Sequence, residues 1–476
     1  MLFNSLEYVC FLPIVFALYW TVPSKYRCYL LLVASYYFYM SWNVKYVAII
    51  VFITVISYVA ALLLEKTVDE KDKRLIVTVA SICCLSVLFF FKYFNFTTTS
   101  FSRLLSLFTI NLSPITLDVL LPVGISFYTF QTLSYVIDVY RGSVHAERNL
   151  IIYATFISFF PQLVAGPIER STNLLQQIKA EHKFNEQKAM AGLKLMLWGY
   201  YKKLLIADNV SVYVDTVYND LSTYRGLDIL LVIFFFSIQI YCDFSGYSDI
   251  AIGTAKLLDI DLMTNFKSPY YSASIKEFWS RWHISLSTWF KDYLYIPLGG
   301  NRCSKVKHYF NLVFTFLVSG LWHGASLTFI LWGGAHGVAQ VFEVMIGKRK
   351  NRVKNTRIGV WIYRLLVFVF CNFMWVLFRA QETTNALYVY RHAFDDVMNP
   401  QVFFTSSLLS RSAFMLLMGY IFVLAIHDYQ GIKEERTTNV LVQNKVIIWT
   451  EYVLLGLVIL FGSQKGGAAE FVYFQF

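Results

Sequence analysis

The chain has 476 residues, of which 57% are hydrophobic and only 15% charged, and its mean hydropathy is +0.52. This composition excludes an ordinary soluble globular protein and predicts an all-α polytopic membrane protein. The formal net charge of +11 would suggest nucleic acid as a partner in a soluble protein. Here the basic residues cluster in short loops between apolar runs, so membrane topology explains them better and membrane lipids are the expected surroundings.

A helix needs about 20 mostly apolar residues to cross a bilayer. The segments that fit best are 6–22, 28–42, 46–64, 75–94, 229–242, 326–346, 359–378, 414–426 and 446–461. Weaker candidates are 115–130, 150–164 and 189–206. Allowing for broken or re-entrant pieces, the same criterion predicts about 11 to 13 membrane segments. No linker is long enough to separate domains, so residues 1–476 are expected to form a single transmembrane domain.

The loop charges predict which side of the membrane each loop occupies. Residues 348–357 carry six basic residues and no acidic one, which places this loop in the cytoplasm. Lys25 and Arg27 fit the same orientation. Counting the helices that follow the basic loop places the C-terminus outside the cytoplasm.

Three segments differ from ordinary spans and loops. Residues 275–298 mix aromatic and charged residues, which favours an interfacial amphipathic helix. Residues 310–321 are too few to cross a bilayer as a straight helix, so we expect His323 to lie at membrane depth inside the protein. Residues 161–170, with a proline near each end, predict a broken helix whose end lines a cavity.

His283, His323 and His336 lie within 54 residues of sequence and are the main candidates for chemistry. No pair has the i, i+4 or HExxH spacing of a zinc site, so no metal is predicted. An imidazole with its ordinary pKa of about 6.5 is a suitable base to deprotonate a hydroxyl that attacks a thioester. A buried histidine can equally be a satisfied polar residue that holds two helices together.

Other polar residues in apolar surroundings also admit two interpretations. Asp243 and Asp249 on one apolar segment are either structural or part of an ion or proton pathway. The aromatic tail 471–476 is either an interfacial anchor or an inserted segment that presents the Tyr473 hydroxyl. Our candidates for substrate contact are the residues around the histidines and this apolar segment: Trp322, Ser326, His336, Asp243 and Trp282.

Several motifs occur together along the chain. They are Met-Leu-Phe-Asn-Ser at the start, residues 122–127, 162–170, 243–249, 278–297, 320–326 and 373–379, and the aromatic tail. In this order they resemble the membrane-bound O-acyltransferase (MBOAT) family, specifically its bacterial cell-envelope branch. That branch includes the membrane subunit of alginate O-acetylation, peptidoglycan O-acetylation proteins and, more distantly, the D-alanyl transfer protein of teichoic acids.

The resemblance implies a ring of helices around a central funnel, where a cytoplasmic acyl thioester meets an acceptor from outside. It places His323 at the family's catalytic histidine and His283 at its polar partner position. It also implies that Tyr473 is a transient acyl carrier and that an extracytoplasmic esterase-like partner completes the transfer.

The function that we predict is therefore transfer of acetyl from acetyl-CoA, or another thioester, across the bacterial inner membrane for O-acetylation of a polysaccharide such as alginate or peptidoglycan. No bound cofactor is expected, because acetyl-CoA acts as a co-substrate. The alternative is a transporter or channel that uses Asp243 and Asp249 in its pathway.

Overall fold

A computed structural model describes residues 1–354, 356–399, 408, 410–434, 453, 455–459, 462 and 471. All regular elements in these residues are helices, as the composition predicts. The chain divides into two compact units, the first formed by Met1–Met196 with Ser248–Met263 and the second by Leu197–Tyr247 with Thr264–Phe476. The expectation of a single domain stays a prediction.

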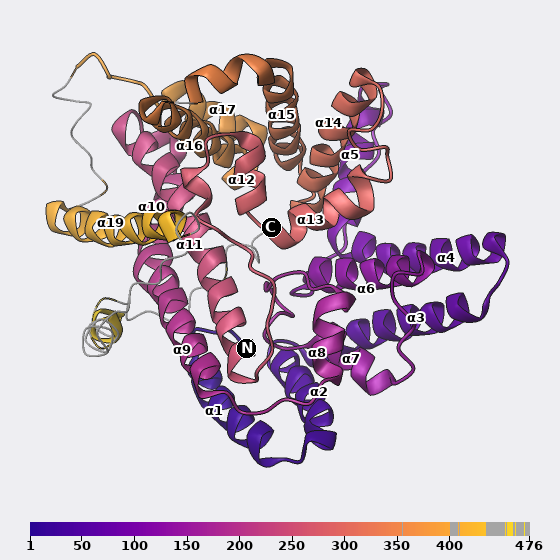
Figure 1. The fold of residues 1–476 in the computed structure, drawn as a ribbon. Coiled ribbons are helices and arrows are strands. Elements are labelled where there is room, and N and C mark those ends of the chain that lie inside the picture. The colour runs from indigo at the N-terminus through magenta and orange to yellow at the C-terminus, as the bar shows by residue number, and fades with distance from the viewer. Residues whose placement is uncertain are drawn as a thin grey trace. The chain divides into compact units, whose positions relative to one another are not determined.

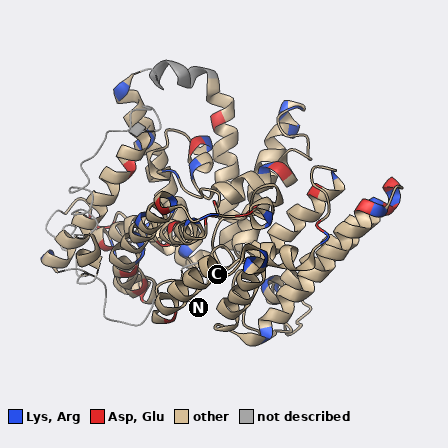
Figure 2. Cartoon of the chain, turned by 60° about the horizontal axis from the view of Figure 1, so that its bottom comes forward, with Lys and Arg blue, Asp and Glu red and all other residues tan. Residues whose placement is uncertain are grey.

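Six helices in the described part of the chain are long and apolar enough to cross a membrane. They are Val44–Lys66, Glu70–Ser106, Leu227–Leu257, Leu327–Gly347, Arg357–Arg379 and Arg411–Ile432. Leu6–Thr21 is an apolar but shorter helix. Figure 2 shows long helical stretches without charge, whereas the tip of one helical hairpin carries both signs. This pattern is that of a multi-pass membrane protein.

The first unit begins with helices that follow one another closely along the chain (Figure 1). Its elements are α1 (Leu6–Thr21), α2 (Ser24–Met40), η1 (Val44–Tyr46), α3 (Val47–Lys66), α4 (Glu70–Leu88), η2 (Phe89–Tyr93), α5 (Phe94–Ser106), α6 (Ile125–Tyr140), α7 (Leu150–Ser158), η3 (Ser171–Leu175) and α8 (Gln176–Lys179). The next helix, α9 (Glu186–Tyr200), continues into the second unit. In the first unit α3 packs against both α4 and α6, and α2 packs against α7.

Gly124 shows how the first unit fixes the start of α6. It precedes the helix with φ 76°, a left-handed conformation in which glycine is unstrained. A Cβ on this residue would lie 2.4 Å from the carbonyl oxygen of Leu163. The glycine thus allows the backbone of 122–124 to contact the turn that follows α7.

The segment 161–170 is not helical at its end but forms turns that lead into an extended stretch. Glu169 at this end is fully buried and accepts hydrogen bonds from the Met263 amide and the Asn173 side chain. Burial raises the pKa of Glu169 to about 7 despite these hydrogen bonds. The predicted helix break is confirmed, and the carboxyl at its end is held by protein groups.

The second unit contains the remaining elements. They are η4 (Tyr201–Ala207), α10 (Asp208–Asn219), η5 (Leu221–Thr223), α11 (Leu227–Leu257, which ends in the first unit), η6 (Pro269–Tyr271), α12 (Ile275–Arg281), α13 (Ile284–Phe290), η7 (Lys291–Tyr295), α14 (Lys305–His323), α15 (Leu327–Lys354), α16 (Arg357–Arg379), α17 (Thr383–His392) and α19 (Arg411–Glu434). Helix α15 packs against α14, α16 and α12.

Glycines allow α14 and α15 to approach until their backbones touch. A Cβ on Gly320 would lie 2.2 Å from the Phe329 carbonyl oxygen, and one on Gly333 would lie 2.2 Å from the Phe316 carbonyl oxygen. Small residues at helix contacts are a common device in membranes, where close packing replaces the hydrophobic effect as the driving force.

Two predictions for the second unit were wrong in detail. Residues 275–298 do not form one interfacial helix, because the helix is interrupted between α12 and α13. The Phe278 and Trp282 rings are also buried in the protein core. Helix α14 is longer than residues 310–321, because it starts at Lys305, within the basic segment 302–308. At a rise of about 1.5 Å per residue its 19 residues extend about 28 Å.

Two of the three weaker span candidates are only partly helical. In 115–130 the helix begins at Ile125, and in 150–164 it ends at Ser158. Residues 189–206 continue from α9 into the π-helical η4. Most of 446–461 lies outside the described residues, so the predicted location of the C-terminus stays a prediction.

We expect Gly333→Ala to destabilise the protein, because its methyl group would overlap the Phe316 carbonyl and overpacking costs about 1–3 kcal/mol. The matched control is Gly347→Ala on the same helix, where a Cβ meets no atom of the described residues within 4 Å. Thermal unfolding in detergent should show a lower Tm for Gly333→Ala alone. Equal Tm values for the two variants would contradict the close contact.

Candidate active site

The three histidines singled out in the sequence are all buried in the second unit. His323 is 3% exposed and is the last residue of α14, whereas His283 and His336 are fully buried. The His283 and His323 ring centroids are 6.3 Å apart. The structure therefore brings the predicted catalytic histidine and its predicted partner together, although 40 residues separate them in sequence.

The backbone and a hydrogen bond fix His283 in place. The residue has φ 45°, a left-handed conformation, and precedes α13. Its Nδ1 lies 3.1 Å from the side-chain oxygen of Asn265, which also accepts hydrogen bonds from the amide and hydroxyl of Ser285. Because a carbonyl oxygen only accepts, Nδ1 carries the proton and Nε2 carries the lone pair. Sequence reasoning missed Asn265, since an asparagine 18 residues before the histidine has no recognisable spacing.

Burial lowers the pKa of His283 to about 3. The ring is thus neutral at physiological pH and is a weak base. This favours a role for His283 as a hydrogen-bonding partner over a role as the residue that takes a proton.

Aromatic rings surround His323. The centroids of Trp322, Trp332 and Phe378 lie 4.9, 5.2 and 5.3 Å from that of the imidazole, and the two tryptophan rings are close to perpendicular to it. Trp332 is fully buried and stacks on Trp375 at 5.6 Å. These rings exclude water and give the histidine a low-dielectric environment, in which electrostatic interactions are strong.

His336 and Trp282 have packing partners that favour a structural role. Trp279 donates its indole N–H to Nδ1 of His336 at 3.2 Å, and the two ring centroids are 5.1 Å apart. Trp282 is fully buried, with Trp375 at 4.9 Å and Phe278 at 5.5 Å. Both predicted substrate contacts are thus buried in the second unit, where Trp282 directly precedes His283.

Ser326 and Asp243 also have protein partners. The Ser326 hydroxyl accepts a hydrogen bond from the Thr328 amide at 3.3 Å, as a residue that caps the start of α15 does. Asp243 is 1% exposed and forms an ion pair of 2.6 Å with Lys203, which also contacts Asp208 at 3.0 Å. A buried carboxylate held by a lysine is typical of structural pairing. Asp249 belongs to the first unit.

The C-terminal tail contributes one described residue to the second unit. Phe471 is 2% exposed, and its ring centroid lies 5.2 Å from that of Tyr247 and 5.6 Å from that of Phe244. Phe244 in turn lies 4.6 Å from the His283 ring. Tyr473 itself lies outside the described residues.

The described residues contain no group of three histidine, cysteine, aspartate or glutamate side chains that could hold a metal ion. The site places the neutral imidazole of His283, whose tautomer is assigned, beside the imidazole of His323. Aromatic rings surround His323. This arrangement suits proton transfer to and from a substrate hydroxyl.

Most of this chain is similar to known proteins. The model of the MBOAT family, membrane-bound O-acyltransferases, matches residues 31–380, a range that contains all three histidines. The chain is 39% identical over 399 residues to the probable alginate O-acetylase AlgI of Azotobacter vinelandii, covering 83% of this chain and 78% of that one.

Two further relatives cover similar shares. The probable alginate O-acetylase AlgI of Pseudomonas aeruginosa is 40% identical over 398 residues, which are 83% of this chain and 75% of that one. The peptidoglycan O-acetyltransferase of Helicobacter pylori is 36% identical over 424 residues, which are 82% of this chain and 79% of that one. The chain therefore belongs to the membrane-bound O-acyltransferase family and is an O-acyltransferase of the multi-pass membrane type.

Proposed function

We propose that the chain is the membrane subunit of a system that O-acetylates a polysaccharide outside the bacterial cytoplasmic membrane. Relatives at 36–40% identity that are named for alginate and for peptidoglycan O-acetylation support this substrate class. The donor that we propose is a cytoplasmic thioester, with acetyl-CoA as the first choice.

In the proposed step His323 acts as general base. It takes the proton of a hydroxyl as that oxygen attacks the thioester carbonyl carbon. The new C–O bond forms, the C–S bond breaks, and the departing thiolate takes the proton back from His323. General base catalysis of this kind contributes about 10²- to 10⁴-fold to a rate.

The observation that carries this proposal is the buried histidine pair. The His283 and His323 rings lie 6.3 Å apart, and a hydrogen bond to Asn265 assigns the tautomer of His283. With its pKa lowered by burial, His283 is suited to orient the hydroxyl or its oxyanion, which leaves proton transfer to His323. Trp322, beside both rings, is the residue that we propose for substrate contact.

We further propose that Tyr473 receives the acetyl group first and carries it as an ester. The support is the burial of Phe471 against Phe244, whose ring contacts His283. A phenol with a pKa of about 10 needs a base to become a nucleophile at neutral pH, and His323 would supply it.

An extracytoplasmic esterase-like partner would then take acetyl from the tyrosine ester and pass it to the polysaccharide. The residues of this chain are predominantly apolar, so the scheme assigns that step to a second protein. The transporter alternative loses its main support, because Asp243 is paired with Lys203.

We expect His323→Gln to lower acetyl transfer about 10²- to 10⁴-fold, the contribution of a general base. The measurements are the ester-linked acetyl content of the cell-envelope polysaccharide and thiol release from acetyl-CoA by the purified protein. His308→Gln, a change of the same type on the same helix, should leave both at the wild-type level. Wild-type acetylation by an equally abundant His323→Gln protein would refute the assignment.

We expect Tyr473→Phe to abolish acetylation of the polymer, since it removes only the hydroxyl that would carry the ester. Intact-mass analysis during turnover should find one acetyl group on the wild-type protein and none on the variant. The double change Tyr473→Phe with Phe474→Tyr keeps the tail composition and moves the hydroxyl by one residue. Undiminished acetylation by Tyr473→Phe would count against the carrier.

A further inference from the structure

A pocket of about 240 Å³ lies in the first unit, where α1, α2 and α7 meet the segment 178–182. Polar and charged residues, among them Lys25, Arg27, Lys179 and His182, form part of its wall. The apolar side chains of Leu31, Ile152, Ile178 and Ile260 form another part. A pocket that is basic in one part and apolar in another fits an amphiphile with an anionic group.

Arg27 is held in one orientation by groups that do not neutralise it. Its Nη1 donates to the His182 carbonyl at 2.7 Å and its Nε to the Val22 carbonyl at 3.3 Å. The guanidinium also lies 5.0 Å from the Tyr19 ring centroid and 4.9 Å from that of Trp20. In the described part of the chain no carboxylate lies within ion-pair distance of it.

The other cations of the pocket differ in how far they are neutralised. Lys25 lies over the Tyr26 ring at 4.8 Å and forms no ion pair with any described residue. Lys179 is paired with Glu147 at 2.8 Å, and Glu181 adds one acidic group to the wall. Arg27 and Lys25 are therefore the cations whose charge the protein leaves available to a ligand.

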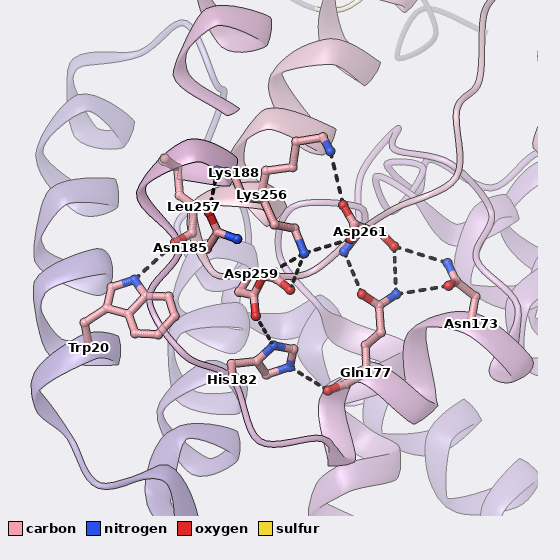
Figure 3. Close-up of polar contacts among 10 residues, drawn as sticks. All are labelled: Trp20, Asn173, Gln177, His182, Asn185, Lys188, Lys256, Leu257, Asp259 and Asp261. Carbon is pink, nitrogen blue, oxygen red and sulfur yellow. Dashed lines mark hydrogen bonds and ion pairs between the residues drawn. The ribbon is translucent and has the colours of Figure 1, made fainter. Parts of the chain in front are cut away.

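A polar network fixes the wall that carries His182 (Figure 3). Its Nδ1 lies 3.0 Å from the Asp259 carboxylate and its Nε2 lies 2.7 Å from the Gln177 carbonyl oxygen. The ring is therefore held at both of its nitrogens, which fixes the part of the wall that it forms.

Lys188 links Asp259 to Asp261 in the same network, at 2.8 and 2.7 Å. Burial would raise the pKa of Asp259, but hydrogen bonds from Lys188 and His182 outweigh it and hold that pKa below its usual range. On the opposite side Trp20 donates to the Leu257 carbonyl at 3.1 Å (Figure 3). The groups around Arg27 are thus fixed by hydrogen bonds that do not involve a ligand.

We propose that this pocket binds a phosphate group, with Arg27 as its main ligand and Lys25 as a second. A fixed guanidinium presents several N–H donors in a plane, which matches two oxygens of a phosphate. The phosphate is carried either by the headgroup of an anionic phospholipid or by a soluble compound. The apolar wall and the exposed apolar side chains of α1, such as Leu6 and Ile14, favour the lipid.

The test compares phosphatidylglycerol, phosphatidylcholine and inorganic phosphate as additives to the purified full chain in detergent. Binding is measured by native mass spectrometry and by the rise in Tm that a ligand of the folded state produces. We expect phosphatidylglycerol to stabilise the wild type more than phosphatidylcholine does. Arg27→Gln should weaken that binding about 10- to 100-fold, as expected for loss of charge-assisted hydrogen bonds.

Two further variants test whether binding depends on the cations of this pocket and not on any basic residue of the first unit. Lys25→Gln changes an exposed side chain and should weaken binding about fivefold, as expected for one basic residue near a charged lipid. Arg148→Gln removes the same charge as Arg27→Gln from another loop of the first unit, where the side chain is 85% exposed, and should change nothing.

The additive that binds the protein and raises its Tm identifies the source of the phosphate. Selective stabilisation by phosphatidylglycerol that depends on Arg27 identifies a lipid headgroup, and the same dependence for inorganic phosphate alone identifies a soluble ligand. A lower Tm for Arg27→Gln with an unchanged response to every additive would overturn the proposal. Arg27 would then only stabilise the fold through its hydrogen bond to the His182 carbonyl. If Arg27→Gln does not fold, unchanged phosphatidylglycerol binding by Lys25→Gln overturns it.

Discussion

The backbone contact between α14 and α15 is the constraint on which the candidate site depends. Gly320 lies three residues before His323, and its contact with the Phe329 carbonyl fixes the end of α14 against α15. The same contact places Trp332 beside the His323 ring. Because close packing, more than hydrophobicity, holds helices together in a membrane, a bulkier residue here would displace the catalytic candidate as well as weaken the fold.

The site combines the histidine pair, His283 and His323, with the aromatic rings that surround it. An imidazole is costly to bury unless its polar atoms are satisfied. The Asn265 oxygen meets this need at Nδ1 of His283 and at the same time accepts a hydrogen bond from Ser285 at the start of α13. The tryptophan rings keep water from the second imidazole, so a proton released in the reaction has few other acceptors.

Hydropathy alone predicted the all-α fold and most of the long helices, because about 20 apolar residues in sequence have few other structures available in a membrane. It failed where polar and aromatic residues are buried inside the protein. The segment 275–298 has the composition of an interfacial helix, yet Phe278 and Trp282 pack into a core that only the tertiary fold creates. The start of α14 was missed because a helix can extend through basic residues once it leaves the apolar layer.

Within the candidate site, the sequence identified His283 and His323 through their apolar surroundings and family motifs. The short distance between their rings and the hydrogen bond from His283 to Asn265 depend on long-range contacts, which no local sequence pattern encodes. Lys25 and Arg27, which form no ion pair within the described part of the chain, were visible only as topology signals. The His182 carbonyl that holds Arg27 comes from a distant segment.

The left-handed backbone at His283 restricts which residues can occupy this position. Asparagine, aspartate and histidine adopt φ near 45° with less strain than most side chains, whereas a β-branched residue is a clear outlier there. Asparagine would therefore fit the backbone and also present a hydrogen-bonding amide. Local geometry thus narrows the substitutions open at position 283 to glycine and a few short polar residues, independently of any demand from the chemistry.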